Sequence, residues 1–270
     1  MSTLGIDSAA YGREIESRGF RSVWFPRIND AKSLDEVEAV LAATSDLHVG
    51  TGIASVWHWD PTNLAARADR LAASYGDRFI LGLGTSHAPA VEALGQAYAK
   101  PYSKMVEFLS GVEQTRAPLM LAALGPKMLE LAGDRTLGAH PYFTPPEHTA
   151  FARQALGPHP LLIPELAVSL TPGADGAASA RAYAAYYLRL PNYTSNLRRF
   201  GFTDADIADG GSDHLIETIT PNGPAGSLAR IRQHLDAGAD HVVVQLVGPS
   251  GKFASGSLGE LASLASDLLA

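Results

Sequence analysis

The fold of this chain is decided by residues 78–87, which read Arg-Phe-Ile-Leu-Gly-Leu-Gly-Thr-Ser-His. Phe79 to Leu83 is a short apolar run with the length of a buried strand. It ends at Gly84 and is followed by three polar side chains, those of Thr85, Ser86 and His87. Glycine backbone beside polar groups at a strand end lets an anionic or polar part of a ligand come close. A strand with a glycine-rich exit turn is the simpler alternative, and the neighbouring segments decide between the two.

Apolar runs and helix signals alternate along the rest of the chain. The other runs expected to form strands are 3–6, 20–25, 47–55, 118–123, 137–142, 161–170 and 241–247. Segments with helical spacing or capping signals are 8–18, 34–41, 60–75, 102–114, 125–132, 144–157, 177–190, 212–219, 227–237 and the segment that begins at Ser257. Strands that alternate with helices indicate a parallel sheet.

Eight such units over residues 1–270 predict a single domain of the α/β class, a (β/α)8 TIM barrel. Its first strand would be shortened to 3–6, and an insertion at about 171–226 would precede the last strand. An open doubly wound sheet is the alternative. That fold usually has a Gly-x-Gly-x-x-Gly turn after its first strand, and no such turn is present there.

Three helix starts are predicted from capping chemistry. Asp60-Pro61 places an aspartate at the N-cap and a proline at the first helical position. Thr144-Pro-Pro-Glu147 is expected to be a capping box, with Phe151 and Leu156 on the buried face of its helix. The last helix is expected to pair Ser257 with Glu260, and its buried stripe would be Leu261, Leu264, Ala265 and Leu268.

Composition excludes several classes of partner. The chain has 270 residues, 46% of them hydrophobic, and its formal net charge of -7 argues against a nucleic-acid partner. Because it contains no cysteine, disulfides and thiolate-bound metals are excluded. No apolar run approaches the roughly 20 residues that span a bilayer, and residues 1–5 lack the features of a signal peptide. We therefore expect a soluble, cytoplasmic protein without membrane contact.

Ligand groups in a barrel lie on the loops after the strands, and several of these loops carry candidates. Gly125 to Met128 opens a helix, whose free N–H groups and positive dipole end can hold an anion. His140 and Tyr142 follow the sixth strand, where a histidine is a candidate acid or base or else a structural residue. Arg27 could meet an anion or remain a solvated surface residue.

The loop Trp57-His58-Trp59 after the third strand is expected to pack against a ligand, a subunit interface or the core. Because His58, His87 and His140 lie on different elements, no metal site is expected. Gly-x-Ser-x-Gly elbows and Walker loops are absent, so hydrolase and P-loop chemistry have no support.

Several short segments together resemble the bacterial luciferase-like monooxygenase superfamily, in particular its branch that uses the deazaflavin coenzyme F420. The segments are 19–24, 47–52, 60–65, 78–84, 121–128 with 131–134, 138–142 with 144–149, and 237–242. They follow one another in the family's order across almost the whole chain. Leu121-Ala-Ala-Leu-Gly-Pro-Lys-Met128 and Thr144-Pro-Pro-Glu-His-Thr149 favour the deazaflavin branch.

The resemblance implies a TIM barrel that holds its cofactor at the carboxyl-terminal mouth. Residues 52–55 would form a bulge, often with a non-proline cis peptide, behind the flavin ring, and 84–87 and 125–128 would hold the cofactor's phosphate and side chain. His140 and Tyr142 would border the ring and the substrate. The implied cofactor-binding residues are Gly52, Ile53, Ala54, Ser55, Gly84, Thr85, Ser86, Ala123, Leu124, Gly125, Lys127, Met128 and Tyr142.

The implied function is hydride transfer between coenzyme F420 and a small organic substrate. The chain reads Trp24-Phe-Pro-Arg27 where several deazaflavin enzymes place an acidic or histidine group, so the proton donor is not carried over. The catalytic candidates are His140, His87 and His58. The alternatives are an FMN-dependent monooxygenase and a catalytically silent flavin-binding relative. A homodimer, with the Trp57 and Trp59 loop contributing, is a further expectation.

Overall fold

The chain folds into two compact units of parallel strands and helices. A computed structural model describes residues 7–112, 114–254 and 258–269, with side chains up to residue 266 in the last helix. The N-terminal unit comprises Met1–Ala123 and Lys127–His140, and the C-terminal unit comprises Leu124–Pro126 and Pro141–Ala270. The strand expected at 3–6 lies outside the described residues, and the single domain over 1–270 stays a prediction.

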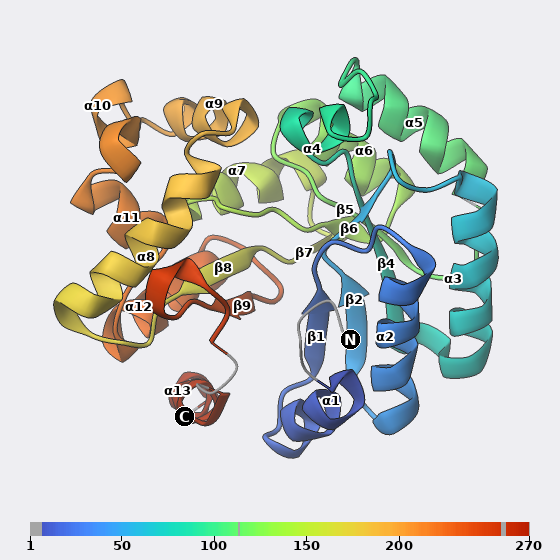
Figure 1. The fold of residues 1–270 in the computed structure, drawn as a ribbon, viewed down its shortest axis with the longest axis horizontal. Helices are drawn as coiled ribbons and strands as arrows, with labels where there is room; N and C mark the ends of the chain where they lie inside the picture. The colour runs from blue at the N-terminus through green and yellow to red at the C-terminus, as the bar shows by residue number, and fades with distance from the viewer. Residues whose placement is uncertain (1–6, 113, 255–257, 270) are drawn as a thin grey trace. The chain divides into compact units, whose positions relative to one another are not determined.

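Parallel strands form the centre of the N-terminal unit (Figure 1). They are β1 (Ser22–Phe25), β2 (His48–Thr51), β3 (Ala54–Ser55), β4 (Phe79–Gly84), β5 (Leu119–Leu121) and β6 (Gly138–Ala139). The order across the sheet is β1-β2-β4-β5-β6, with the short β3 paired to β4. The helices are α1 (Ser8–Ser17), α2 (Ala31–Ala43), α3 (Pro61–Tyr75), α4 (Ala88–Glu92), α5 (Pro101–Val112) and α6 (Pro126–Arg135). The predicted alternation of strands and helices is confirmed.

The sheet of this unit is strongly curled. Trp24 on β1 and His140, which follows β6, stack with their ring centroids 4.3 Å apart and their planes 18° apart. In a flat sheet, four strand spacings would separate β1 from β6 by roughly 19 Å. The two rings therefore meet inside the curl, as a barrel requires. Gly50 leaves room for this stack, because a Cβ there would come within 2.5 Å of the Trp24 ring.

The glycines of residues 78–87 serve the packing of β4 against its neighbours. The Thr51 hydroxyl donates to the Gly82 carbonyl at 2.8 Å and accepts the Gly82 N–H at 2.7 Å. A Cβ at Gly82 would overlap the Thr51 carbonyl oxygen, and a Cβ at Gly84 would lie 2.6 Å from Cγ1 of Ile53. Glycine is therefore required at both positions by the neighbouring segment 51–53.

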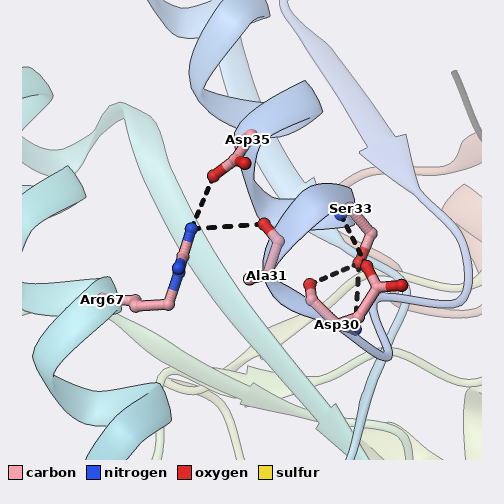
Figure 2. Close-up of polar contacts among 5 residues, drawn as sticks. All are labelled: Asp30, Ala31, Ser33, Asp35 and Arg67. Carbon is pink, nitrogen blue, oxygen red and sulfur yellow. Dashed lines mark hydrogen bonds and ion pairs between the residues drawn. The ribbon is translucent and has the colours of Figure 1, made fainter. Parts of the chain in front are cut away.

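A capping box starts α2 and fixes the loop that leaves β1 (Figure 2). The Asp30 carboxylate accepts the Ser33 N–H at 2.8 Å, and the Ser33 hydroxyl accepts the Asp30 N–H at 3.2 Å. Arg67 on α3 donates to the Ala31 carbonyl at 3.2 Å and forms an ion pair with Asp35 at 2.5 Å. The first turn of α2 is thus tied to α3. The predicted N-cap at Asp60 is confirmed by its bond from the Asn63 N–H at 3.0 Å.

The C-terminal unit contains β7 (Leu161–Leu162), β8 (Glu165–Val168) and β9 (Val243–Leu246), and β8 and β9 pair in parallel (Figure 1). Its helices are α7 (Pro146–Leu156), α8 (Gly173–Tyr187), α9 (Pro191–Arg199), α10 (Asp204–Ile207), α11 (Asp213–Ile219), α12 (Pro224–Asp236) and α13 (Leu258–Leu269). The insertion expected before the last strand is confirmed and consists of α8 to α11. Its core includes Tyr183, Leu197, Leu215 and Ile219.

Some boundaries differ from those expected. The capping box at Thr144 is wrong, because the N-cap of α7 is Pro145 and no side chain caps it. Phe151 is only half-buried, and His148 and Thr149 lie on the buried face instead. In the last helix Leu261 and Leu264 are buried and Ala265 is half-buried, while Ser257 and the Leu268 side chain lie outside the described residues. Within the described ranges, no helix combines the length and the hydropathy needed to cross a membrane.

Candidate functional site

The carboxyl ends of the strands in the N-terminal unit are joined by backbone hydrogen bonds. The Gly52 N–H donates to the Phe25 carbonyl at 2.8 Å, and the Ile28 N–H donates to the Ile53 carbonyl at 3.1 Å. Further along this edge, the Val56 N–H donates to Gly84 at 3.1 Å. The loops after β1, β2, β3 and β4 therefore form one continuous wall. Carboxyl ends of parallel strands are where α/β proteins place their ligands.

The bulge expected at residues 52–55 is present. Gly52 and Ile53 are joined by a cis peptide bond, and the chain then resumes as β3, with Ala54 opposite Leu83 and Ser55 opposite Gly84. Ala54 and Ser55 are buried, whereas Gly52 and Ile53 are partly exposed. The geometry matches the expectation, and contact of these four residues with a cofactor stays a prediction.

The loop after β4 is held by aromatic side chains. The Trp57 indole N–H donates to the Thr85 carbonyl at 2.8 Å, and the Tyr98 hydroxyl donates to the Ser86 carbonyl at 3.4 Å. Ser86 has a φ of 56°, a left-handed conformation that non-glycine residues adopt rarely. Residues in such conformations cluster at functional sites. The space beside Gly84 is filled by the Ile53 side chain rather than left open.

The tryptophans of the 57–59 loop contact the core of their own unit. Trp57 bonds the β4 loop, and the Trp59 indole N–H donates to the Ile28 carbonyl at 2.8 Å. Of the three alternatives for this loop, the core contact is therefore observed. Arg27 is exposed and has a φ of 54°.

The three candidate histidines differ in environment. His140 is only 2% exposed and stacks on Trp24, whereas His58 and His87 are half-buried. Burial lowers the pKa of His58, with Asp30 acting in the opposite direction, so His58 is neutral at pH 7. His87 is the N-cap residue of α4. Within the described residues, no group of three side chains is arranged to hold a metal ion.

Trp24 is a further candidate for the site, and the sequence patterns did not single it out. Its ring lies between the Gly50 backbone and His140, and its buried indole N–H has no hydrogen-bond acceptor in the described part of the chain. The sequence signal that could have indicated this contact is a tryptophan on β1 together with a glycine, Gly50, on the neighbouring strand β2.

The remaining candidates lie around the start of α6 and after β6. Ala123 is buried, Lys127 is exposed and Met128 is half-buried, all in the N-terminal unit. Leu124 and Gly125 belong to the C-terminal unit, where no side chain or backbone atom lies within 4 Å of a Cβ built at Gly125. Gly125 therefore allows close approach, as expected.

A tyrosine network surrounds Tyr142 in the C-terminal unit. The amide oxygen of Gln245 accepts the hydroxyls of Tyr142 and Tyr183, each at 2.9 Å. The Tyr142 hydroxyl also lies 2.9 Å from that of Tyr187. Burial, followed by the neighbouring tyrosine Tyr187, raises the pKa of Tyr183 well above its usual value. Tyr183 and Tyr187 were not predicted, because they lie in the insertion, far from any strand end in sequence.

Part of the chain matches a known protein family in sequence. Residues 7–116 match the family model of the luciferase-like monooxygenases. A 5,10-methylenetetrahydromethanopterin reductase of Methanolobus tindarius is 24% identical over 306 aligned positions, which cover 93% of this chain and 94% of the reductase.

Solved structures extend the comparison to the fold. An F420-dependent secondary alcohol dehydrogenase in complex with an F420-acetone adduct superimposes with a TM-score of 0.74 at 15% identity, covering 95% of this chain and 92% of that one. The oxygenating constituent of 3,6-diketocamphane monooxygenase from Pseudomonas putida, in complex with FMN, gives a TM-score of 0.64 at 14% identity, covering 98% and 92%. The predicted fold class, a luciferase-like TIM barrel, is confirmed. The resemblance of this chain to the luciferase-like monooxygenase superfamily, including enzymes that use coenzyme F420, is confirmed as well.

Proposed function

We propose that this chain is an oxidoreductase that binds coenzyme F420 and transfers a hydride between it and a small organic substrate. The observation that carries the proposal is the alignment with a reductase of Methanolobus tindarius along 93% of this chain. A second support is that the F420-dependent alcohol dehydrogenase superimposes with a higher TM-score, 0.74, than the FMN-bound monooxygenase, 0.64.

Residues of this structure fit such a cofactor. The partly exposed backbone of Gly52 and Ile53 offers a wall for a flat ring. In the N-terminal unit, the buried Trp24 indole N–H is a donor with no acceptor among the described residues. In the C-terminal unit, the open space beside Gly125 offers room for an anionic group. When bound, the deazaflavin supplies the hydride chemistry. The chain then has to orient the substrate and move one proton.

His140 and His87 are the candidates for that proton transfer. His140 is held in place by its stack on Trp24, which would fix the direction of its ring. His87 is half-buried at the end of the β4 loop. His58 is better suited to accept a proton than to donate one at pH 7, because burial lowers its pKa. Tyr142 would border the substrate.

An FMN-dependent monooxygenase is the second candidate. It is supported by the FMN-bound structure, which superimposes over 98% of this chain. The two functions differ in the cofactor that binds, and therefore binding separates them before any substrate is known.

A titration of the purified protein with coenzyme F420 and, separately, with FMN tests the proposal. The expected result is saturable binding of F420 that is tighter than binding of FMN. Tight binding of FMN alone would favour the monooxygenase, and binding of neither cofactor would favour a catalytically silent relative. The His87→Ala variant should lose turnover, while a His159→Ala variant, altered at an exposed position of the C-terminal unit, should match the wild type.

A further inference from the structure

A buried histidine holds the loop between β5 and α6. His148 on α7 is fully buried, and its Nε2 lies 2.9 Å from the Leu124 carbonyl oxygen. A carbonyl only accepts hydrogen bonds, so Nε2 of His148 carries the proton. The other ring nitrogen, Nδ1, is buried and has no hydrogen-bond partner among the described residues. His148 is therefore the neutral Nε2–H tautomer.

This contact sets the direction of a neighbouring N–H group. The carbonyl of Leu124 and the N–H of Gly125 belong to one planar peptide unit, and in a trans peptide they point in opposite directions. Because His148 holds the carbonyl toward the interior of the C-terminal unit, the Gly125 N–H points away from it. That N–H donates to no atom of the described residues. Gly125 adds no side chain, and the space beside its Cα is open.

We propose that His148 is a positioning residue that orients the Leu124–Gly125 peptide so that the Gly125 N–H binds an anionic oxygen of the ligand. A phosphate or a carboxylate oxygen meets this chemistry. The inference rests on the proposed function, because it assigns an anionic group to the ligand of that same site.

The surroundings of His148 keep its ring fixed and neutral. The rings of Phe151 and Phe200 pack against it, with centroids 6.2 Å and 5.4 Å away. The pKa of His148 is lowered to about 4, mainly by burial and also by the charge of Arg199, although the bond to the Leu124 carbonyl acts in the opposite direction. A neutral imidazole carries one N–H, so it can donate to the Leu124 carbonyl only through Nε2. The peptide is therefore held in one orientation at neutral pH.

Two variants separate positioning from structural support. His148→Gln keeps an N–H donor for the Leu124 carbonyl, and His148→Leu removes it while filling similar space. Inorganic phosphate is titrated into each 15N-labelled protein, and the shift of the Gly125 amide signal is followed. We expect saturable shifts in the wild type and His148→Gln, and binding weaker by roughly tenfold in His148→Leu, about the effect of one charge-assisted hydrogen bond.

Unchanged phosphate affinity in a folded His148→Leu variant would overturn the inference, and so would equal losses in both variants. The 15N signals of the His148 ring in the wild type give a test that needs no variant, since an Nδ1–H tautomer contradicts the assignment. If the Gly125 amide responds to phosphate as expected while neither F420 nor FMN binds, the inference stands and the proposed function fails.

Discussion

Acidification should destabilise this protein through two buried histidines of the C-terminal unit. His148 on α7 and His234 on α12 are 0% and 1% exposed, and Nδ1 of His234 lies 2.8 Å from the Thr149 hydroxyl. Burial lowers the pKa of both rings, and the facing charges of Arg199 for His148 and of Arg230 for His234 contribute to the lowered values of about 4 and about 3. Both rings are therefore neutral in the folded protein at pH 7.

The size of the effect follows from proton linkage. In the unfolded chain both histidines titrate near their ordinary pKa of about 6.5. As the pH falls below that value, both histidines become protonated in the unfolded state. In the folded state His148 stays neutral down to about pH 4 and His234 down to about pH 3. Stability is thus fully present above about pH 6.5 and is lost below it. Each histidine loses about 1.4 kcal/mol per pH unit, or roughly 2 to 3 kcal/mol between pH 6.5 and pH 4.5.

Urea unfolding followed by circular dichroism at several pH values between 7 and 4.5 measures this loss. The His148→Gln variant has no imidazole to protonate at this position. Its free energy of unfolding should therefore fall less steeply as the pH decreases, by about 1.4 kcal/mol per pH unit. Carboxylates with lowered pKa values, such as Asp69, contribute equally to both proteins and cancel in the comparison. Substitution of the exposed His159 by glutamine should leave the wild-type slope unchanged. Parallel pH profiles of the wild type and His148→Gln would refute the reasoning.

Four further substitutions test the N-terminal unit and the α6 loop by the same unfolding assay. Gly82→Ala places a Cβ on the Thr51 carbonyl oxygen and should lower the free energy of unfolding by about 3 kcal/mol or more. Gly125→Ala meets open space and should lower it by less than about 1 kcal/mol. Equal losses in the two variants would contradict the packing of Gly82 against Thr51. Asp30→Ala removes the N-cap of α2 and should cost about 1 kcal/mol, and an unchanged stability would show that the cap is dispensable. Trp24→Ala empties the inside of the curled sheet and should cost roughly 3 kcal/mol, a loss that a solvent-exposed ring would not produce.

Much of the fold could be predicted because its signals are local. Apolar runs such as 79–83 and caps such as Asp60 act within a few residues of chain, and β4 and α3 lie where those signals placed them. The stack joins Trp24 on β1 to His140, which follows β6, and these two strands are not neighbours in the sheet, so no local pattern encodes it. No helix is predicted between the segments 177–190 and 212–219, yet α9 and α10 form there.

The candidate site was predicted less completely. The loops were chosen because ligand loops follow parallel strands, and their role in a site stays a prediction. The bulge expected at 52–55 is present. Gly84 shows the limit of this reasoning. A glycine at a strand end indicates that another group packs closely against the backbone. At Gly84 that group is the Ile53 side chain. His148 lies within the segment 144–149 that carries the family resemblance. Its bond to Leu124 is a tertiary contact, which the local sequence does not predict.

The most direct test of the central claim is a fluorescence titration of coenzyme F420 with the purified protein. The account predicts saturable binding of one F420 per chain, weakened in the His148→Leu variant and unaffected by His159→Ala. A folded protein that binds neither F420 nor FMN at millimolar concentration would contradict it.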